Sequence, residues 1–485
     1  MITWGISANS HDAALTVFLD EKIAFASHSE RFSKIKNDPD LDRDLINYAL
    51  RWGEPQRIYW YEKPFKKSLR QLIAGQGFNF AENNIKEYLR KFNIKQPITY
   101  VDHHLSHAAG GYYTSGWDSA AILVIDAIGE FTTASMWRGQ GRDIKPLWKM
   151  KYPNSIGLFY SAVTKAVGLK PNQDEYILMG MAAYGDPYKF YDHFFDNYIN
   201  LDDLTFKQNF HRGISDLENL IKTEKDKFDI AATAQLFYED MFDNLLLDLY
   251  IETKERKLIL SGGCALNCSA NKLAFQWFDD VWIMPNPGDA GSSLGCVLAH
   301  NKWHTYWPGP YLGYNIPGEY PVQSIIKELE NNKICAVASG PAEFGPRALG
   351  NRSLLADPRD PGIKDRVNDI KQRQKFRPFA PVIMEHLAEK FFDMPAKSTP
   401  YMQFTAVCRE PSKYPSIIHQ DGTSRVQTVN RDQHPGLYAV LEHMWHKHGC
   451  AMLLNTSLNV KDQPMLNDLV DAKNWTSQYG LPVIS

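Results

Sequence analysis

The sequence lacks the features that mark several large classes of protein. Its six cysteines form no CxxC pair, so neither a disulfide framework nor a structural zinc site is indicated. No apolar run reaches the roughly 18 residues needed to cross a bilayer. Lysine and arginine (53) nearly balance aspartate and glutamate (56), and the net charge of −3 argues against binding to nucleic acid through overall charge.

The first residues, MITWGISANSHD, contain no basic stretch followed by an apolar core, so we expect no signal peptide. We therefore expect a cytoplasmic enzyme with reduced thiols. Hydrophobic residues make up 44% of the chain and charged residues 22%, which is typical of globular proteins. At 485 residues, the chain exceeds a single ordinary core and predicts two or three domains.

The first 300 residues predict an α/β domain. Residues 120–126 (AAILVID) form an almost wholly apolar run, typical of a buried central strand. Residues 229–250 carry apolar side chains at helical spacing. A strand, a tight polar turn and a second strand occur at residues 2–18 and recur at 121–137. Actin-like ATPases contain two such halves, although two hairpins can also recur by coincidence.

A segment rich in proline, glycine and aromatic residues follows, beginning at Tyr306 and reaching Pro321. Such composition indicates a domain boundary or an ordered arm between domains. We predict a first domain over residues 1–305, a linker over 306–324 and a second domain over 325–485.

The segment VDHHLSHAA is the first candidate site. On a helix, His103 and His107 stand at positions i and i+4 on one face and can bind one metal ion, whereas His104 points elsewhere. Most isolated HxxxH pairs are instead surface or capping histidines. Two distant acids favour the metal interpretation. Asp126 ends an apolar strand, where an acid is costly unless it is paired or ligates something, and Asp289 lies in the glycine-rich turn NPGDAGSS.

This set of side chains limits the metal without choosing it. Two imidazoles and two carboxylates suit Fe(II), Mn(II) or Zn(II). The HEXXH motif is absent, so a zinc protease of that type is not indicated.

Two further motifs indicate anion binding. In LILSGGCALN, a strand runs into Gly262 and Gly263, where backbone N–H groups can approach an anion or nucleotide, although a lone GG turn is more often structural. Residues 343–377 carry nine Lys/Arg against five Asp/Glu, interleaved with Gly, Pro, Phe and Leu. Such a run is usually a solvated face, but this irregular order suits convergence on a polyanion, which arginine binds through two oxygens at a time.

At these residues a family resemblance becomes specific. The sequence resembles the NodU/CmcH/TobZ-type O-carbamoyltransferases in about ten blocks that occur in the same order over residues 1–465. The blocks are NSHDAA, SERF, VDHHLSHAA, NSIGLFYSAVT, EYILMGMAAYG, LSGGCALNCSAN, NPGDAGSSLG, EFGPRALGNRSLLADPRD, FRPFAP, DGTSRVQTV and LLNTSLNV.

The resemblance implies an α/β fold with an N-terminal actin-like (ASKHA) domain similar to TsaD and a C-terminal α/β YrdC-like domain. It implies two substrates, ATP (with Mg) and carbamoyl phosphate, and a divalent metal, with iron favoured. Carbamoyl adenylate would form in the YrdC-like domain and would then transfer its carbamoyl group to an acceptor hydroxyl in the metal-bearing domain.

The resemblance also implies roles for individual residues. The metal ligands would be His103, His107, Asp126 and Asp289. Arg347, Arg425 and Asn455 would hold carbamoyl phosphate, and Lys371, Arg377 and Ser457 would hold the phosphates of ATP. Gly262, Gly263 and Asn267 match the nucleotide side of the N-terminal site, and His11 and Asp12 match a motif near the transfer centre.

The sequence departs from the family pattern at two positions of one motif. Ile177 stands where the family usually has lysine, and Ala183 stands where it has proline. A contact to nucleotide or acceptor is therefore lost or rebuilt. The ending after Pro464 keeps little of the family pattern.

Two other functions compete with the transferase. One is an actin-like sugar kinase with a fused regulatory domain, which leaves the Arg-rich second half unexplained. The other is a nucleotide-gated binding module without catalysis, which the two departures favour but the intact set of His, Asp, Arg and Lys does not.

The acceptor itself is left open. It would be a hydroxyl on a small molecule or on a hydroxymethylated nucleotide or nucleic-acid base. Trp60, Trp117, Trp137 and Tyr160 could stack on it, although core packing is the commoner use of such residues. The cations Lys63, Lys66, Lys67 and Arg70 would suit an anionic acceptor, although a solvated helix face is the commoner meaning. We expect no membrane partner and allow for a homodimer.

Overall fold

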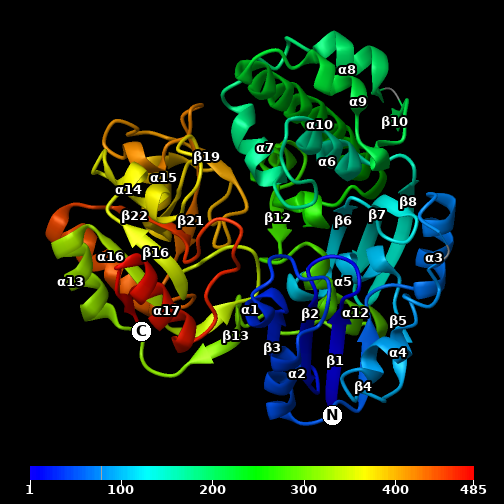
Figure 1. Cartoon of the computed structure of the whole chain (residues 1–485), viewed down its shortest axis with the longest axis horizontal. Helices are drawn as coiled ribbons and strands as arrows, with labels where there is room; N and C mark the ends of the chain where they lie inside the picture. Colours follow the sequence, from blue (N-terminus) through cyan, green and yellow to red (C-terminus); the bar gives the residue numbers. More distant parts are fainter. Residues whose placement is uncertain (78, 202) are drawn as a thin grey trace. The chain divides into compact units, whose positions relative to one another are not determined.

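The computed structural model describes residues 1–77, 79–201 and 203–485. The chain divides into two compact units. The first unit contains residues 1–24 and 39–307, and the second unit contains residues 25–38 and 308–485 (Figure 1). The fold is mixed α/β, as predicted, and the more specific actin-like and YrdC-like assignments stay predictions.

The first unit is built on two five-stranded sheets with the same strand order (Figure 1). In β3-β2-β1-β4-β5, strand β2 is antiparallel to β1, while β4 and β5 continue parallel to it. In β8-β7-β6-β11-β12, strand β7 is antiparallel to β6, while β11 and β12 are parallel to it. The hairpin repeat noticed in the sequence therefore extends to the whole topology. The strands are β1 (Ile2–Ser7), β2 (Ala14–Leu19), β3 (Lys22–His28), β4 (Arg57–Trp60), β5 (Ile98–Tyr100), β6 (Ser119–Ile125), β7 (Thr132–Gln140), β8 (Asp143–Lys151), β11 (Lys257–Ser261) and β12 (Asp280–Ile283).

Two helices at equivalent places in the repeat pack directly against each other. α5 (His103–Thr114) follows β5 and α12 (Ser292–Asn301) follows β12. Gly295 makes the close approach possible, because a Cβ atom there would lie 1.9 Å from the carbonyl oxygen of Ser106. The packing places the turn before α12 beside the first turns of α5.

The remaining helices of the first unit surround these sheets. The longest, α10, begins with a capping box between Thr223 and Asp226 and buries the apolar residues that predicted it. Within the described residues, no helix is long and apolar enough to span a bilayer. The helices are α2 (Arg43–Ala49), α3 (Pro64–Ile73), α4 (Ile85–Arg90), α6 (Ile156–Ala166), α7 (Glu175–Ala182), α8 (Tyr191–Asn197), α9 (Ser215–Leu220), α10 (Glu224–Thr253) and α11 (Cys268–Asn271), and a short pair of strands is formed by β9 (Ile199–Asn200) and β10 (Thr205–Phe206).

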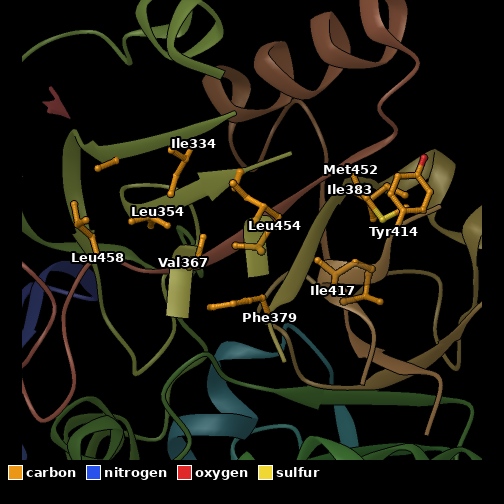
Figure 2. Close-up of a cluster of buried hydrophobic side chains, with 14 of the residues drawn as sticks. Ile334, Leu354, Val367, Phe379, Ile383, Tyr414, Ile417, Met452, Leu454 and Leu458 are labelled. Atoms are coloured by element: carbon orange, nitrogen blue, oxygen red, sulfur yellow. The ribbon is translucent and has the colours of Figure 1, made fainter. Parts of the chain in front are cut away.

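The second unit contains a six-stranded sheet in the order β21-β17-β22-β16-β14-β23. An apolar core packs against it, with Leu354, Met452 and Phe379 among its members (Figure 2). The strands are β14 (Ile334–Ala338), β16 (Arg352–Ala356), β17 (Ala380–Met384), β21 (Gln427–Val429), β22 (Met452–Ser457) and β23 (Val483–Ile484), with smaller sheets of β13 (Tyr311–Ile316) and β15 (Gly340–Glu343), and of β18 (Phe392–Asp393), β19 (Thr405–Cys408) and β20 (Thr423–Arg425). The helices are α13 (Val322–Asn332), α14 (Ile363–Ile370), α15 (Glu385–Phe391), α16 (Pro435–His448) and α17 (Leu469–Tyr479).

The second unit takes one segment from the start of the chain, residues 25–38, which the sequence had placed in the first domain. In this segment, the buried Arg31 of α1 (Glu30–Ser33) donates a hydrogen bond to the carbonyl of Gly345 at 2.9 Å. The rings of His28 and Phe32 pack on Phe344 and Tyr314. The predicted linker of residues 306–324 also differs from a plain connection, because it contains β13 and joins the second unit from Pro308 onward.

Candidate functional site

The predicted site residues of the first unit follow the carboxyl ends of parallel strands. His103 follows β5, Asp126 follows β6, and Asp289 lies a few residues after β12. Loops at the carboxyl ends of strands form the ligand-binding crevice in open α/β sheets. The repeat thus delivers side chains from distant parts of the sequence to one place.

Four side chains meet there and form what we call the His–Asp cluster: His103, His107, Asp126 and Asp289. The Nε2 atom of His103 lies 3.1 Å from Oδ2 of Asp126 and 3.1 Å from Nε2 of His107. The Nε2 atom of His107 lies 3.3 Å from Oδ1 of Asp289. Ligands held about 2.1 Å from a tetrahedral ion stand about 3.4 Å apart, so these separations fit one shared divalent ion.

The environment of His107 orients it as a ligand. Its Nδ1 lies 3.1 Å from the carbonyl oxygen of Pro287, which can only accept a hydrogen bond. The Nδ1–H therefore donates, and in the neutral ring Nε2 presents its lone pair to the cluster, as in most metal-binding histidines. The neighbouring His104 points away and contacts the Ser135 hydroxyl at 2.7 Å, as predicted.

Charge within the cluster favours a bound cation. Burial by itself would lower the pKa of His103, but Asp289 and Asp126 outweigh that effect and raise the pKa well above its ordinary value. Burial would raise the pKa of Asp126, but hydrogen bonds to His103 and His107 outweigh it and hold the pKa well below its ordinary range. Two buried carboxylates thus demand positive charge, which protons or a metal ion can supply.

Gly262 and Gly263 lie against the residues that end β6, and their predicted role toward a nucleotide stays a prediction. Gly262 has φ +88°, and a Cβ atom there would lie 2.2 Å from the carbonyl oxygen of Ile125. The N–H of Gly263 donates to Oδ1 of Asp126 at 3.3 Å. The two glycines therefore let this turn approach the acid that ends β6.

The other predicted residues of this unit make contacts outside the cluster. The His11 Nε2 atom contacts the carbonyl oxygen of Asn172 at 2.8 Å, and Asp12 lies in the same loop after β1 with φ +54°. Asn267 caps α11 by accepting from the N–H of Ala270 and donates to Gln235 at 3.0 Å. The printed partners of His11 and Asn267 are therefore residues outside the cluster.

The motif with the two family departures is locally intact. Ile177 is buried in α7, so its apolar side chain belongs to the core, and Ala183 caps the end of that helix. Glu175 accepts hydrogen bonds from the Ser161 hydroxyl at 2.6 Å and the Asn172 N–H at 2.5 Å. The change from lysine to isoleucine thus fills a core position here.

Three of the four aromatic residues considered as stacking platforms are core residues: Trp60, Trp137 and Tyr160 are all buried. Trp117 is half-buried and carries the ammonium group of Lys257 5.5 Å above its ring. Core packing therefore accounts for the first three.

In the second unit, Lys371 and Ser457 lie together, and their predicted role on the phosphates of ATP stays a prediction. The buried Lys371 ammonium donates to the Ser457 hydroxyl at 3.3 Å and to Oδ1 of Asn459 at 2.8 Å. Burial lowers the pKa of Lys371 well below its ordinary value, and the charges of Arg373 and Arg377 add to this effect. Together these cations form an electropositive centre suited to phosphate groups.

A second group of predicted residues adjoins the first through β22. Asn455 lies two residues before Ser457, so both side chains share one face of the strand. Its amide donates to Oε1 of Gln427 at 2.6 Å and to the carbonyl of Ala348, next to Arg347, at 3.1 Å. Its own amide oxygen is buried and has no hydrogen-bond partner in the described part of the chain.

The loop that carries Arg347 is held by hydrogen bonds from its backbone to the side chains of Glu343 and Gln427. Glu343 accepts from the N–H groups of Leu349, Asn351 and Arg352 through one carboxylate oxygen. The Gln427 amide donates to the carbonyl of Leu349 at 3.1 Å. Arg425 precedes Gln427 by two residues at the end of β20 and is half-buried.

Two residues of this group, Gln427 and Asn459, received no individual role from the sequence. Both lie inside the motifs DGTSRVQTV and LLNTSLNV, which were expected only to supply further polar groups at the ends of short apolar runs. The only signal available was their position two residues after Arg425 and Ser457, on the same side of an extended chain.

The family model described as Carbamoyltransferase N-terminus matches residues 54–298, and the model described as Carbamoyltransferase C-terminus matches residues 326–484. The chain belongs to the carbamoyltransferase family. It is therefore a transferase enzyme.

Relatives of this carbamoyltransferase match most of its length. The nodulation protein NolNO of Sinorhizobium fredii is 32% identical over 95% of this chain and 76% of its own. The 3'-hydroxymethylcephem-O-carbamoyltransferase of Amycolatopsis lactamdurans is 28% identical over 97% of this chain and 95% of its own. Among solved structures, the HypF of T. kodakarensis matches 62% of this chain and 47% of its own, with 13% identity and a TM-score of 0.37.

We expect this carbamoyltransferase to contain about one divalent ion per chain, iron or manganese, when it is purified without chelator. The His103→Ala, His107→Ala double variant removes both imidazoles of the cluster and should lose the ion. The matched control is the His443→Ala, His448→Ala double variant, because within the described residues the half-buried His443 and the exposed His448 form a second candidate group with Glu330. Elemental analysis of the three proteins decides it, and equal metal content in all three would show that the ion is bound elsewhere.

The buried Glu130 should make the stability of the folded protein depend on pH. Burial and the charge of Asp102 raise the pKa of Glu130 from 4.5 to about 7. The unfolded chain therefore releases this proton at lower pH than the folded protein, and stability falls as pH rises from about 4.5 to about 7. The variant Glu130→Gln has no such proton to lose. Its free energy of unfolding minus that of the wild type should therefore be about 2–3 kcal/mol larger at pH 8 than at pH 5.

Urea unfolding at the two pH values measures the effect. The control is Glu54→Gln, because Glu54 is exposed. This substitution should change the free energy of unfolding by the same amount at pH 5 and pH 8. An equal effect of Glu130→Gln at pH 5 and pH 8 would mean that Glu130 titrates near its ordinary value.

Proposed function

We propose that this enzyme is an ATP-dependent O-carbamoyltransferase that works in two steps. In the second unit, carbamoyl phosphate is hydrolysed to carbamate and phosphate, and carbamate attacks the α-phosphate of ATP to give carbamoyl adenylate and pyrophosphate. In the first unit, an acceptor hydroxyl attacks the carbamoyl carbon, the bond to the AMP oxygen breaks, and AMP leaves. The acceptor is a hydroxyl group of a small molecule or of a hydroxymethylated nucleotide or nucleic-acid base.

The electropositive centre around Lys371 supports the first step. ATP and carbamoyl phosphate together bring roughly six negative charges, which must be offset by fixed cations near the reacting atoms. Arg347, Arg377 and Arg425 can bind phosphate oxygens in pairs, while Lys371 supplies a point charge. The unpartnered amide oxygen of Asn455 can accept a hydrogen bond from the NH₂ group of the carbamoyl moiety.

The His–Asp cluster supports the second step, and its geometry is the observation that carries the proposal. Four residues from three separate segments would hold the ion, which, when bound, supplies positive charge to the departing AMP phosphate. The chain's own part is to fix the ligands: Pro287 sets the tautomer of His107, and Gly263 orients Asp126. Carbamate is a poor electrophile, so activation as a mixed anhydride with AMP provides the leaving group.

Product analysis without any acceptor tests the proposal. The wild-type enzyme, ATP and carbamoyl phosphate should yield pyrophosphate at a rate that depends on carbamoyl phosphate. Formation of ADP in place of pyrophosphate would favour the kinase alternative, and no nucleotide turnover at all would favour the binding module. With pyrophosphate established, a mass-spectrometric screen for a gain of one carbamoyl group then identifies the acceptor.

A further inference from the structure

Helix α3 buries two of its three basic side chains and exposes apolar ones. Phe65 is 63% exposed and Ile73 is 62% exposed, whereas Lys67 is 4% exposed and Arg70 is 7% exposed. The sequence suggested a solvated basic face, and for Lys67 and Arg70 that interpretation is wrong. Buried cations on this helix therefore have partners or a task inside the first unit.

The two buried cations differ in how their charge is balanced. The Lys67 ammonium is ion-paired with Glu62 at 2.7 Å and also donates to the carbonyl of Asn9 at 2.7 Å. Arg70 donates from Nη1 to the neutral amide oxygen of Gln76 at 2.8 Å. Its Nε is buried without a hydrogen-bond partner, and no carboxylate of the described residues lies within ion-pair distance of its guanidinium group.

Such an arrangement is costly unless a ligand completes it. Burying a cation without an anion loses its hydration with little return, and each N–H left without an acceptor adds to the loss. Burial lowers the pKa of Arg70, and the nearby Glu62, Tyr152 and Tyr61 only partly oppose this effect. An anion placed against the guanidinium would supply both the missing charge and the missing acceptor.

The segment that begins at Tyr61 connects helix α3 with the His–Asp cluster. Tyr61 directly follows β4, and its ring packs on the ring of His103 with centroids 5.2 Å apart. Glu62, the next residue, is ion-paired with Lys67 of α3 at 2.7 Å. Helix α3 also reaches the start of α5, because Lys66, one turn before Arg70, donates to Asp102, the residue before His103, at 3.3 Å.

We propose that Arg70 is the anion-binding residue of a subsite beside the His–Asp cluster, and that it binds a phosphate-like oxyanion of a ligand held at the cluster. This proposal rests on the proposed function, which places both carbamoyl adenylate and the acceptor in the first unit. The oxyanion has two possible sources, the phosphate of the adenylate or an anionic group of the acceptor. The guanidinium fork suits either, because it offers parallel N–H donors to two oxygens.

Anion titrations by calorimetry test the subsite in the metal-loaded, full-length protein. All proteins carry Arg347→Gln, which weakens phosphate binding in the second unit. Against that parent, Arg70→Gln should weaken binding of inorganic phosphate at least about tenfold, the loss of one charge-assisted contact, and Arg70→Lys should weaken it less. The control is Arg51→Gln, because Arg51 is exposed and stacks on Tyr48, and this variant should bind as the parent does.

Competition with AMP separates the two sources. If AMP displaces phosphate from the subsite, the oxyanion belongs to the adenylate; if phosphate still binds with AMP in excess, the oxyanion belongs to the acceptor. Equal phosphate binding by the parent and Arg70→Gln, or no phosphate binding by the parent, would overturn the subsite.

A melting experiment separates a binding role from a structural one. Without anion, Arg70→Gln should melt at or above the temperature of the parent, because an unbalanced buried charge has been removed, and added phosphate should raise Tm only in the parent and the Arg51→Gln control. A large fall in Tm with unchanged response to phosphate would show that Arg70 is structural. Pyrophosphate release by Arg70→Gln in an otherwise wild-type chain tests the proposed function separately, because this step belongs to the second unit.

Discussion

His107→Ala should stop acceptor carbamoylation while pyrophosphate release from ATP stays within about twofold of wild type. His107 supplies one imidazole of the His–Asp cluster, and its Nδ1–H is fixed by the carbonyl of Pro287. Removal of the ring leaves two buried carboxylates with a single histidine, so the ion that would stabilise the leaving AMP is weakly held or lost. We expect transfer to fall at least about 1000-fold, comparable with the loss of several kcal/mol of transition-state stabilisation.

Transfer is measured as carbamoylated acceptor by mass spectrometry, and the first step as pyrophosphate, in the same reaction. His300→Ala is the control, because His300 is an exposed histidine of the same unit, at the far end of α12. Circular dichroism confirms that both variants are folded. Equal loss of both activities in folded His107→Ala protein would contradict the assignment of the two steps to separate sites.

Lys371→Ala should abolish pyrophosphate release, with a fall of about 100- to 1000-fold in turnover. The buried ammonium group lies within 3.3 Å of the Ser457 hydroxyl and 2.8 Å of the Asn459 amide oxygen, which direct it toward one face of β22. Among the described residues, no acid forms an ion pair with Lys371, whereas Glu62 pairs with Lys67 at 2.7 Å. The charge is therefore available for the phosphates of ATP.

The matched control is Lys447→Ala, which removes an exposed lysine near the end of α16 in the same unit. Metal content should be unchanged in both variants, because the His–Asp cluster lies in the first unit. Normal pyrophosphate release by Lys371→Ala would remove the electropositive centre from the mechanism and would leave the first step without its assigned cation.

The parts of the site that the sequence predicted depend on local rules. The i and i+4 spacing places His103 and His107 on one face of α5, and an acid after an apolar strand, Asp126, needs a partner wherever that strand lies. The distances of 3.1–3.6 Å within the cluster confirm that these residues and Asp289 converge.

What the sequence did not predict depends on tertiary partners. The pattern of α3 alone gives a basic face and an apolar face, but not which of them is buried. Lys67 points inward because its ammonium group donates to Glu62 and to the carbonyl of Asn9. Asn9 lies in the loop after β1, and Glu62 lies in the loop after β4. The same holds for Asn455, whose amide partner Gln427 lies 28 residues earlier in the chain and reaches it only through the order of strands in the sheet.

The segment of residues 25–38 has a consequence for dissecting the enzyme by truncation. Because the chain leaves the first unit, completes the second and returns, neither unit corresponds to one continuous stretch of gene. A fragment of residues 308–485 would lack Arg31, Phe32 and Lys34, which contact Gly345, Tyr314 and Asp471. In such a fragment Phe344 would lose its contact with the ring of His28. The fragment would therefore expose apolar surface that is covered in the intact enzyme, and it would tend to aggregate. Gene fusions or split versions of this enzyme would therefore need the early segment supplied alongside, for instance as a tethered peptide.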